Sequence, residues 1–252
     1  MKIITHNGIF HADEIFAIAL LKKVFGKHIS IERTRTISKK DLNNKDVWVL
    51  DVGSMYSPIK HNFDHHQDEN LSSTNMLVLN YLFSENLIDE EIHKYLHTSF
   101  ETISMIDKNG EKEFNGWQVN TLIRAMNYIP NGWKIAEKIA YSYIESAYTS
   151  YKESLNSLKI WKNRKIINQH ICYTKKFPIY WKRYKESIFL IFNDEIEQQF
   201  KLLTINFEKY PIHATGSEIF IHNEKFIAIY AKYEDALEGA KNSVKCINLL
   251  TK

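Results

Sequence analysis

The sequence predicts an α/β protein with a parallel sheet in its first half. Three observations predict it. Short apolar segments alternate with a helical segment over residues 2–64, helical patterning dominates residues 71–158, and short apolar segments return from residue 165. Strands that alternate with helices are typical of parallel sheets. We therefore expect a parallel-sheet domain, a long joining helix and a smaller α/β C-terminal domain.

Four strands and one helix are expected in the first 66 residues. Residues 12–25 place apolar side chains close to helical spacing, and Gly26 is a suitable C-terminal stop. Residues 28–33 alternate like a half-buried strand, whereas Val47–Val52 is a continuous apolar run that fits a buried parallel strand. The expected strands cover residues 2–5, 28–33, 47–52 and 59–64.

The longest helix is expected over residues 133–158, where the texture of the sequence changes. A final helix fits residues 233–247. The apolar runs between them cover residues 166–173, 188–192, 202–207, 219–221 and 226–230. The predicted domains are a catalytic domain over 1–130, a connector helix over 131–158 and a substrate-binding domain over 159–252.

Composition excludes several classes of protein. With 44% hydrophobic and 13% aromatic residues, the 252-residue chain can bury a core and is not disordered. The longest apolar run, Ile15–Leu21, is too short for a membrane span, which needs about 20 residues. No secretory signal is recognisable, and two cysteines are too few for a disulfide scaffold. We expect a cytoplasmic protein with no membrane partner; a homodimer stays an open alternative.

Metal-competent side chains follow three of the expected strands. The first strand leads into His6, the third ends at Asp51 and the fourth enters Asp64-His65-His66. Ligands of parallel sheets bind beyond the carboxyl ends of the strands, so these groups should converge. A shell of imidazoles and carboxylates suits divalent manganese, iron or zinc. Surface histidines and helix-cap acids explain any one of these residues, but the whole set favours a metal site.

Several motifs occur in a defined order along the chain. They are Thr5–Glu14, Arg33-Thr34-Arg35, Asp51-Val52-Gly53, Phe63–Gln67, Leu71-Ser72-Ser73, Ile106–Gly110, Ile219–His222 and Asp235-Ala236-Leu237. Through them the sequence resembles the DHH phosphoesterase superfamily, which takes its name from the motif Asp64-His65-His66. Within it, the sequence is most similar to the melanocyte proliferating gene family of metal-dependent exonucleases. The match is specific in the first half and diffuse in the second.

The resemblance implies a set of roles. The implied catalytic residues are Asp51, His65 and His66, of which Asp51 would bridge two metal ions and His66 would face the substrate phosphate. The implied metal ligands are His6, His11, Asp13, Asp51, His65 and Asp107. The expected cofactor is two Mn²⁺ ions, with Mg²⁺, Fe²⁺ or Zn²⁺ as alternatives. Two such ions activate a water for phosphodiester hydrolysis, and the family implies exonuclease action on RNA in the 3′ to 5′ direction.

Basic residues indicate where a substrate could bind. Arg33 and Arg35, two of only five arginines, share one face of an expected strand and fit a phosphate clamp, or a solvated edge strand. Residues 159–185 contain nine basic residues, no acidic one and six aromatics, as single-stranded nucleic acid requires. A lysine-rich surface over a core that uses some of those aromatics explains the segment equally well. The candidate substrate-binding residues are His66, Arg33, Arg35, Lys175, Lys176, Arg183 and, from the C-terminal motif, His222.

Two other functions compete with RNA hydrolysis. The same centre could hydrolyse a small phosphate compound such as pyrophosphate, a cyclic dinucleotide or a very short oligonucleotide. The chain could also be a catalytically inactive relative that binds nucleic acid. The second alternative is motivated by Ala228-Ile229-Tyr230, which stands where the family has a Gly-Gly segment.

Overall fold

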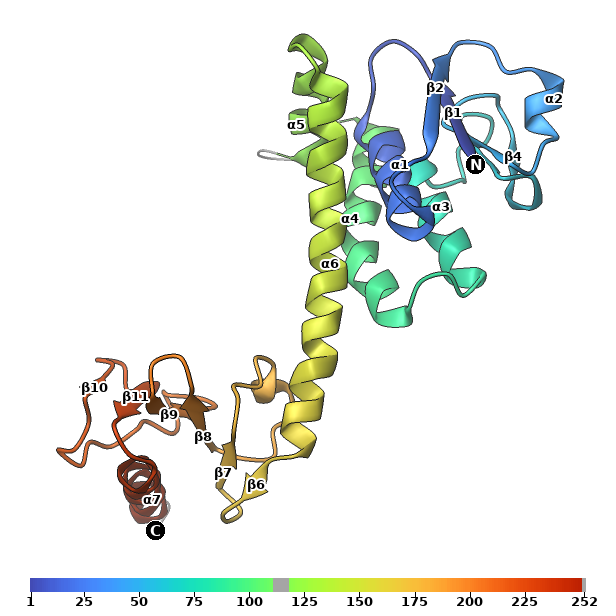
Figure 1. Ribbon diagram of the computed structural model, residues 1–252. Coiled ribbons are helices and arrows are strands. Elements are labelled where there is room, and N and C mark those ends of the chain that lie inside the picture. The colour runs from blue at the N-terminus through green and yellow to red at the C-terminus, as the bar shows by residue number, and fades with distance from the viewer. Residues whose placement is uncertain (111–117, 251–252) are drawn as a thin grey trace. The chain divides into compact units, whose positions relative to one another are not determined.

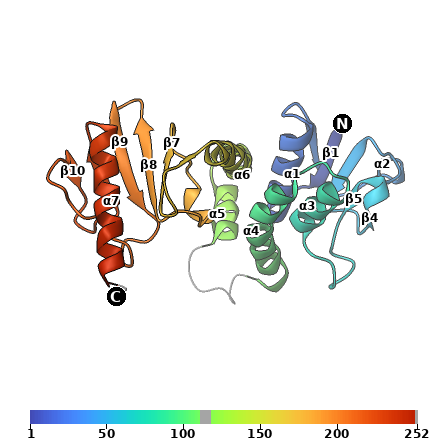
Figure 2. The same ribbon diagram turned by 90° about the horizontal axis from the view of Figure 1, so that it is seen from below.

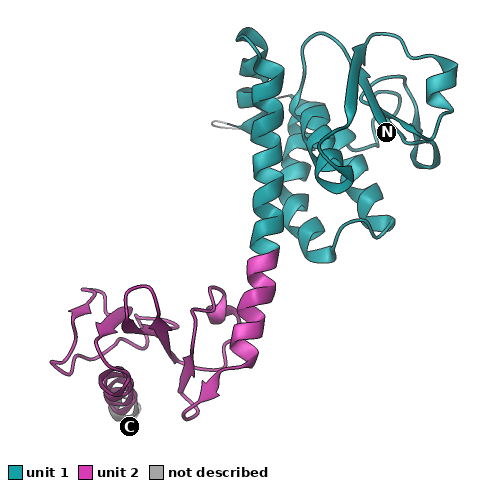
Figure 3. Cartoon of the chain, in the orientation of Figure 1, with its two compact units in different colours: residues 1–151 teal, residues 152–252 magenta. Residues whose placement is uncertain are grey.

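The computed structural model describes residues 1–110 and 118–250 (Figure 1). It divides into two compact units, residues 1–151 and 152–252 (Figure 3). The division falls inside helix α6, Gly132–Lys162, between the boundaries at residues 130 and 158 that the sequence predicts for a connector. Each unit has its own sheet and its own core, so the α/β class is confirmed.

Unit 1 contains a five-stranded sheet in the order β2-β1-β3-β5-β4. All neighbouring pairs are parallel except β4 with β5, so the predicted parallel sheet is confirmed. The strands are β1 (Lys2–His6), β2 (Ser30–Thr34), β3 (Val47–Leu50), β4 (Tyr56–Ser57) and β5 (Asn62–Phe63).

Both faces of this sheet are covered. Alternate residues of a strand point to opposite faces, and in β1 Ile3 belongs to the large core while Ile4 belongs to a small second cluster. Helices α1 (Ala12–Phe25) and α3 (Thr74–Ser84) cover the first face, and the short helix α2 (Lys39–Leu42) lies on the other (Figures 1 and 2). Because helices cover both faces, the ends of the strands are the part of the sheet that these helices leave uncovered.

Helices complete unit 1. Helix α4 (Glu90–Asn109) packs on α3 and α1, and Phe100 on α4 meets Phe16 on α1 edge to face at 5.8 Å. The shorter α5 (Val119–Ala125) and the 3-10 helix η3 (Met126–Tyr128) follow, and α6 contributes buried alanines such as Ala140 to the same core.

One expected strand is much shorter than predicted. Of residues 59–64, only Asn62–Phe63 form β5, because Pro58–Lys60 form the 3-10 helix η1. Proline has a fixed φ and no N–H, so it favours the start of such a turn. His61 then takes a left-handed conformation, with φ +57°, that reverses the chain into β5. The apolar pattern alone does not reveal this turn.

Unit 2 contains a mixed sheet in the order β10-β11-β9-β8-β7-β6, in which only β7 and β8 run parallel among the described strands. The strands are β6 (Lys165–Ile166), β7 (Ile171–Thr174), β8 (Phe189–Asp194), β9 (Gln199–Thr204), β10 (Phe220–Ile221) and β11 (Ile227–Tyr230). The 3-10 helix η4 (Trp181–Arg183) lies between β7 and β8, and α7 (Tyr233–Leu250) follows the last strand.

The run expected over residues 166–173 is divided by a turn. Asn168 Oδ1 accepts hydrogen bonds from the N–H groups of His170 and Ile171, which folds the chain back from β6 into β7. Asparagine side chains commonly stabilise turns in this way. Among the described residues, no helix is long and apolar enough to cross a lipid bilayer.

Candidate metal centre

The metal-competent residues of unit 1 gather at the carboxyl edge of its parallel sheet. His6 is the last residue of β1, Asp51 directly follows β3, and His65 lies two residues after β5. Helix α1 begins next to them, with His11 at its N-cap. The strand ends therefore converge as the sequence predicts, since parallel strands all deliver their carboxyl ends to one edge.

Asp51 occupies the centre of the group. It is 4% exposed, and its backbone is left-handed, with φ +57°. Its N–H donates to the carbonyl oxygen of Phe63, and the Thr74 hydroxyl donates to its Oδ1. The two carboxylate oxygens each lie 3.3 Å from an imidazole Nε2, Oδ2 from that of His6 and Oδ1 from that of His65. One carboxylate thus connects two imidazoles from different strands.

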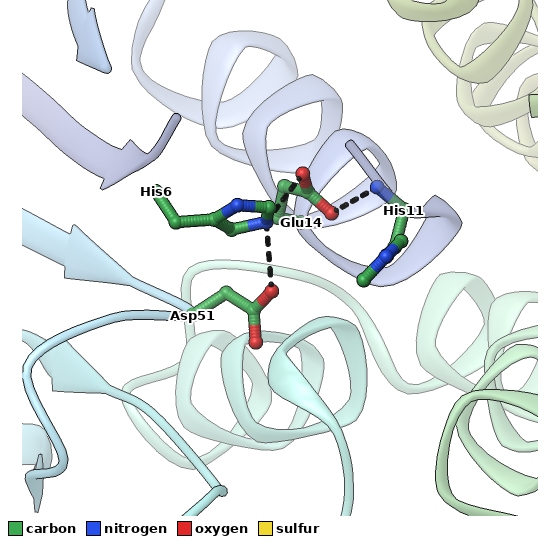
Figure 4. A group of neighbouring side chains, drawn as sticks. All are labelled: His6, His11, Glu14 and Asp51. Atoms are coloured by element: carbon green, nitrogen blue, oxygen red, sulfur yellow. Dashed lines mark hydrogen bonds and ion pairs between the residues drawn. The ribbon is translucent and has the colours of Figure 1, made fainter. Parts of the chain in front are cut away.

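The first turn of α1 supplies two fully buried acids, Asp13 and Glu14. Glu14 Oε2 accepts a hydrogen bond from the His11 N–H at 2.8 Å, and Glu14 Oε1 lies 3.0 Å from His6 Nε2 (Figure 4). The N-terminus of a helix favours negative charge, which helps to hold these acids in place.

Asp107 on helix α4 completes the group, next to His65 and His11. It lies in the last turn of α4, where the helix dipole disfavours an anion. Its Oδ2 is 3.3 Å from His65 Nε2, and its Oδ1 is 4.0 Å from His11 Nδ1. His65 Nε2 also lies 3.8 Å from Asp13 Oδ2.

Buried atoms that make no hydrogen bond indicate that this donor set fits a cation. They are both carboxylate oxygens of Asp13, Oε1 of Glu14 and the Nε2 atoms of His6 and His65. All but Asp13 Oδ1 lie in the ion-pair contacts described above. A buried polar atom without a partner costs about 1–3 kcal/mol. These are the atoms that ligate divalent metals, so a bound cation would satisfy them together.

Burial disfavours the charged forms of Asp13 and Glu14. Burial, together with the carboxylates of Asp51 and Asp107, raises the pKa of Asp13 well above its ordinary value. Burial raises the pKa of Glu14 from 4.5 to about 7. Without a cation, these groups therefore tend to hold protons.

The pKa values of the imidazoles are raised as well, because acids surround them. The carboxylates of Asp51 and Glu14 raise the pKa of His6 to about 10. Burial lowers the pKa of His65, but Asp107 and Asp51 outweigh it and raise that pKa to about 9. Burial alone would raise the pKa of Asp51; the imidazoles of His6 and His65 instead hold it well below its usual range.

Among the residues that the structure describes, three groups of side chains have ligand atoms that lie within 4.8 Å of one another: His6, His11, Glu14 and Asp51; Asp51, His65 and His66; and His11, Asp13 and Asp107. Asp51 belongs to the first two groups, and His11 belongs to the first and third. All the ligands that the resemblance implies are therefore gathered at this centre, and Glu14 joins them.

His66 differs from its neighbours because its side chain is 58% exposed. Its Nδ1 lies 2.7 Å from Asp64 Oδ1, and Asp64 Oδ2 accepts the Ser54 N–H at 2.6 Å. Asp64 is thereby fixed by the backbone and orients His66, not the buried His65. The Asp64 carboxylate raises the pKa of His66, which favours an imidazolium facing solvent.

A comparison with protein families matches residues 2–88 to MYG1_exonuc, described as an uncharacterised protein family, UPF0160. The match contains the strand ends that carry His6, Asp51 and His65. The chain is similar to the MYG1 family over residues 2–88. The expected family resemblance is confirmed for this part.

Curated MYG1 relatives match segments of the chain. The mouse MYG1 exonuclease is 44% identical over 66 residues, which are 26% of this chain and 17% of that protein. A MYG1 protein of Caenorhabditis elegans is 32% identical over 140 residues, 44% of this chain and 40% of that protein. A MYG1 protein of Chlamydia pneumoniae is 37% identical over 100 residues, which are 38% of this chain and 33% of that protein. The matches thus span less than half of these MYG1 relatives.

Solved structures resemble the chain only distantly. A pGpG-specific phosphodiesterase, PggH from Vibrio, is 13% identical with a TM-score of 0.34, and the match covers 98% of this chain and 99% of that one. RecJ from Thermus thermophilus in complex with Mn²⁺ is 10% identical with a TM-score of 0.29, and the match covers 97% of this chain and 51% of that one.

Arg33 and Arg35 lie beside the centre, and Arg33 is engaged by the protein itself. Arg33 donates to the carbonyl oxygens of His6 and Gly8 and stacks over Trp133 at 4.4 Å. These contacts hold the loop between β1 and α1. Arg35 is exposed and donates to Asn7 Oδ1 at 3.1 Å. A phosphate-binding role stays a prediction for both.

The other predicted substrate residues lie in unit 2. Lys175 and Lys176 are exposed and line one cavity, whereas Arg183 stacks over the Tyr180 ring at 4.1 Å. His222 follows β10 and packs against Phe226 at 4.2 Å. Their roles in binding also stay predictions.

The aromatics of residues 159–185 are divided between core and surface. Trp161 and Trp181 are each only 2% exposed and form part of a buried cluster, so they cannot stack on nucleic acid bases. Phe177 is 40% exposed but already stacks on Phe192 at 4.7 Å. The interpretation of this segment as a row of stacking platforms is therefore wrong for its two tryptophans.

Sequence reasoning did not single out Glu14 as a site residue. The signal was present, because Glu14 stands three residues after His11, where a glutamate closes a capping box, and directly after Asp13. What the sequence does not show is that the same carboxylate also reaches His6.

We expect Glu14→Gln to lower the affinity for Mn²⁺ by about 10–100-fold while the fold is kept. Glutamine has the same size and can still accept the His11 N–H, but it brings no charge to His6. Isothermal titration of Mn²⁺ would measure the change. Glu101→Gln, on the exposed face of α4, is the matched control. Equal Mn²⁺ affinities for the two variants would contradict a role for Glu14.

Proposed function

We propose that this chain is a divalent-metal-dependent phosphodiesterase that hydrolyses RNA as an exonuclease. One observation carries the proposal: among the described residues, Asp51 belongs to two groups of metal-competent side chains at the carboxyl ends of the strands, and His11 connects the first of these groups to a third. Shared ligands are what a pair of closely spaced ions requires. The MYG1 exonucleases of mouse and human, each 44% identical to this chain over 66 residues, bear the name of the proposed activity.

The residues of the centre fall into those that hold cations and those that face outward. His6, His11, Asp13, Asp51, His65 and Asp107 would hold two ions, with Glu14 beside them. Bound divalent ions lower the pKa of a water and stabilise negative charge on a phosphoryl group. Mn²⁺ suits the mixed imidazole and carboxylate donors, and Mg²⁺, Fe²⁺ and Zn²⁺ are the alternatives to test.

The protein's own contribution is orientation and charge. His66, fixed by Asp64, would donate a hydrogen bond to a non-bridging phosphate oxygen, because its raised pKa favours the protonated form. A cavity of about 170 Å³ opens beside His11 and Asp107, and Arg124 also lines it. A guanidinium there adds positive charge next to the acidic centre and suits a phosphate group.

The test is to incubate the purified protein with 5′-labelled single-stranded RNA and each of Mn²⁺, Mg²⁺, Fe²⁺ and Zn²⁺, with EDTA as the blank. We expect products that shorten one nucleotide at a time from the 3′ end, and none with EDTA. Hydrolysis of pyrophosphate or a dinucleotide without cleavage of RNA would favour the small-phosphate alternative. Binding of RNA without cleavage under every cation would favour the inactive relative.

A further inference from the structure

Unit 2 contains a cavity of about 560 Å³ where the end of α6 meets β6 and β7. All the residues around it belong to unit 2. They are Asn156, Lys159, Ile160, Asn163, Lys165, Tyr173, Lys175 and Lys176, and we call this cavity the lysine pocket.

Four lysine side chains line one cavity and give it a positive charge. Lys159, Lys165, Lys175 and Lys176 are all exposed, and none of the ion pairs found among the described residues involves them. Residues 159–185 contain no acidic residue. From outside the segment, the charge of Glu195 acts on Tyr173, whose pKa is raised by burial and by this charge. Like charges that converge on a concave surface focus a positive potential there. The pocket therefore favours a ligand with several negative charges.

The remaining lining suits a nucleotide more than a bare ion. Tyr173 is half-buried and faces Lys165 across the β6–β7 pair, and Ile160 adds an apolar side chain from α6. Asn156 and Asn163 contribute amides. A volume of about 300–1,000 Å³ is typical of sites that hold whole small molecules, so the pocket accommodates phosphates together with a sugar or base.

The structure also separates this pocket from other basic residues of the same segment. Lys182 and Arg183 do not line it, and Arg183 is stacked over Tyr180 instead. The positive charge of residues 159–185 is thus not one uniform surface; part of it is concentrated in a cavity.

We propose that the lysine pocket binds the sugar-phosphate backbone of single-stranded RNA at a position other than the phosphodiester being cut. The shared chemistry is a chain of phosphates, which free pyrophosphate also offers. The identity of the strand as substrate rests on the proposed function, but binding to the pocket is independent of the metal centre, whose residues all belong to unit 1.

The experiment measures binding without catalysis. Fluorescence anisotropy with a 5′-labelled twelve-nucleotide RNA in EDTA compares the unmodified protein with Lys165→Glu/Lys175→Glu. The control is Lys182→Glu/Lys241→Glu, which makes the same change in charge at exposed positions of unit 2 outside the pocket. Thermal unfolding of all three proteins checks that the fold is kept. Unlabelled pyrophosphate serves as a competitor.

We expect the pocket variant to bind RNA at least tenfold more weakly and the control variant to stay within about threefold of the unmodified protein. The slope of log Kd against log salt should fall by about 1.4 in the pocket variant, since each lost phosphate contact removes about 0.7. Equal weakening of both variants, or of neither, would overturn the proposal. Displacement of RNA by pyrophosphate at lower concentration than by unlabelled RNA would overturn the assignment to a strand.

RNA cleavage measured in parallel separates this proposal from the proposed function. A protein that cleaves no RNA but shows the difference in binding would refute the exonuclease and leave the pocket in place. If the protein cleaves RNA and both variants bind RNA equally well, the exonuclease proposal is supported and the lysine pocket is refuted as a binding site.

Discussion

Asp51→Asn is expected to lower kcat for RNA hydrolysis by about 10²–10³-fold, the loss typical of removing one electrostatic contact to the reacting charge. Asp51 touches both His6 and His65 and belongs to two of the three ligand groups. No other described residue connects both of these imidazoles within 3.5 Å. Removing its charge should therefore affect both cation positions.

Asparagine is the substitution of choice because Asp51 has φ +57°. Asparagine tolerates this left-handed conformation, whereas alanine would strain the turn after β3. Thermal unfolding of the variant in EDTA checks that its fold is kept. The control is Asp46→Asn, which changes an exposed aspartate directly before the amino end of the same strand. Retained hydrolysis in Asp51→Asn would exclude the proposed centre.

Mn²⁺ is expected to raise the Tm of the protein by on the order of 5–10 °C at saturating concentration, and by more at pH 8 than at pH 6. The sign follows from the raised pKa values of Asp13, Glu14, His6 and His65. Each group binds a proton more tightly in the folded state than in the unfolded one. Glu14 therefore contributes stability that is complete below pH 4.5 and is lost as the pH rises through about 7.

The two imidazoles extend the same trend. Their contribution is complete below pH 6.5 and is lost as the pH rises through about 9 for His65 and about 10 for His6. The lowered pKa of Asp51 acts in the other direction, but only under acid conditions below its ordinary value of 3.8. Between pH 6 and pH 8 the protein in EDTA should thus become less stable.

A metal replaces the protons that are lost. Metal ligands must be deprotonated, so Mn²⁺ binds more tightly as the pH rises. Differential scanning fluorimetry at pH 6, 7 and 8, with Mn²⁺ or EDTA, measures both effects, and Asp51→Asn shows how much of the gain depends on the centre. A Tm gain that is equal at all three pH values would contradict the assignment of these groups as ligands.

Local sequence patterns were enough to show which strands deliver chemistry. The alternation of apolar strands and helices predicts a parallel sheet, and parallel strands share a carboxyl edge, so His6, Asp51 and His65 could be placed together from these patterns. Asp107 joined them only through the family motif, since on sequence it is an acid at the end of a helix. The structure brings its carboxylate to 3.3 Å from His65.

Which side chains are buried, and which are already engaged, depends on the packing of whole elements. Glu14 reaches His6 because α1 starts close to the end of β1. Arg33 binds the carbonyl oxygens of His6 and Gly8 because β2 pairs with β1 and places it beside the β1–α1 loop. In unit 2, burial removed Trp161 and Trp181 from the surface, and the β6–β7 turn gathered lysines that lie up to 17 positions apart. The physical reason is the same in each case. The periodicity of apolar residues predicts whether one segment is a helix or a strand. Contacts between elements depend on how their faces pack, which no local pattern encodes.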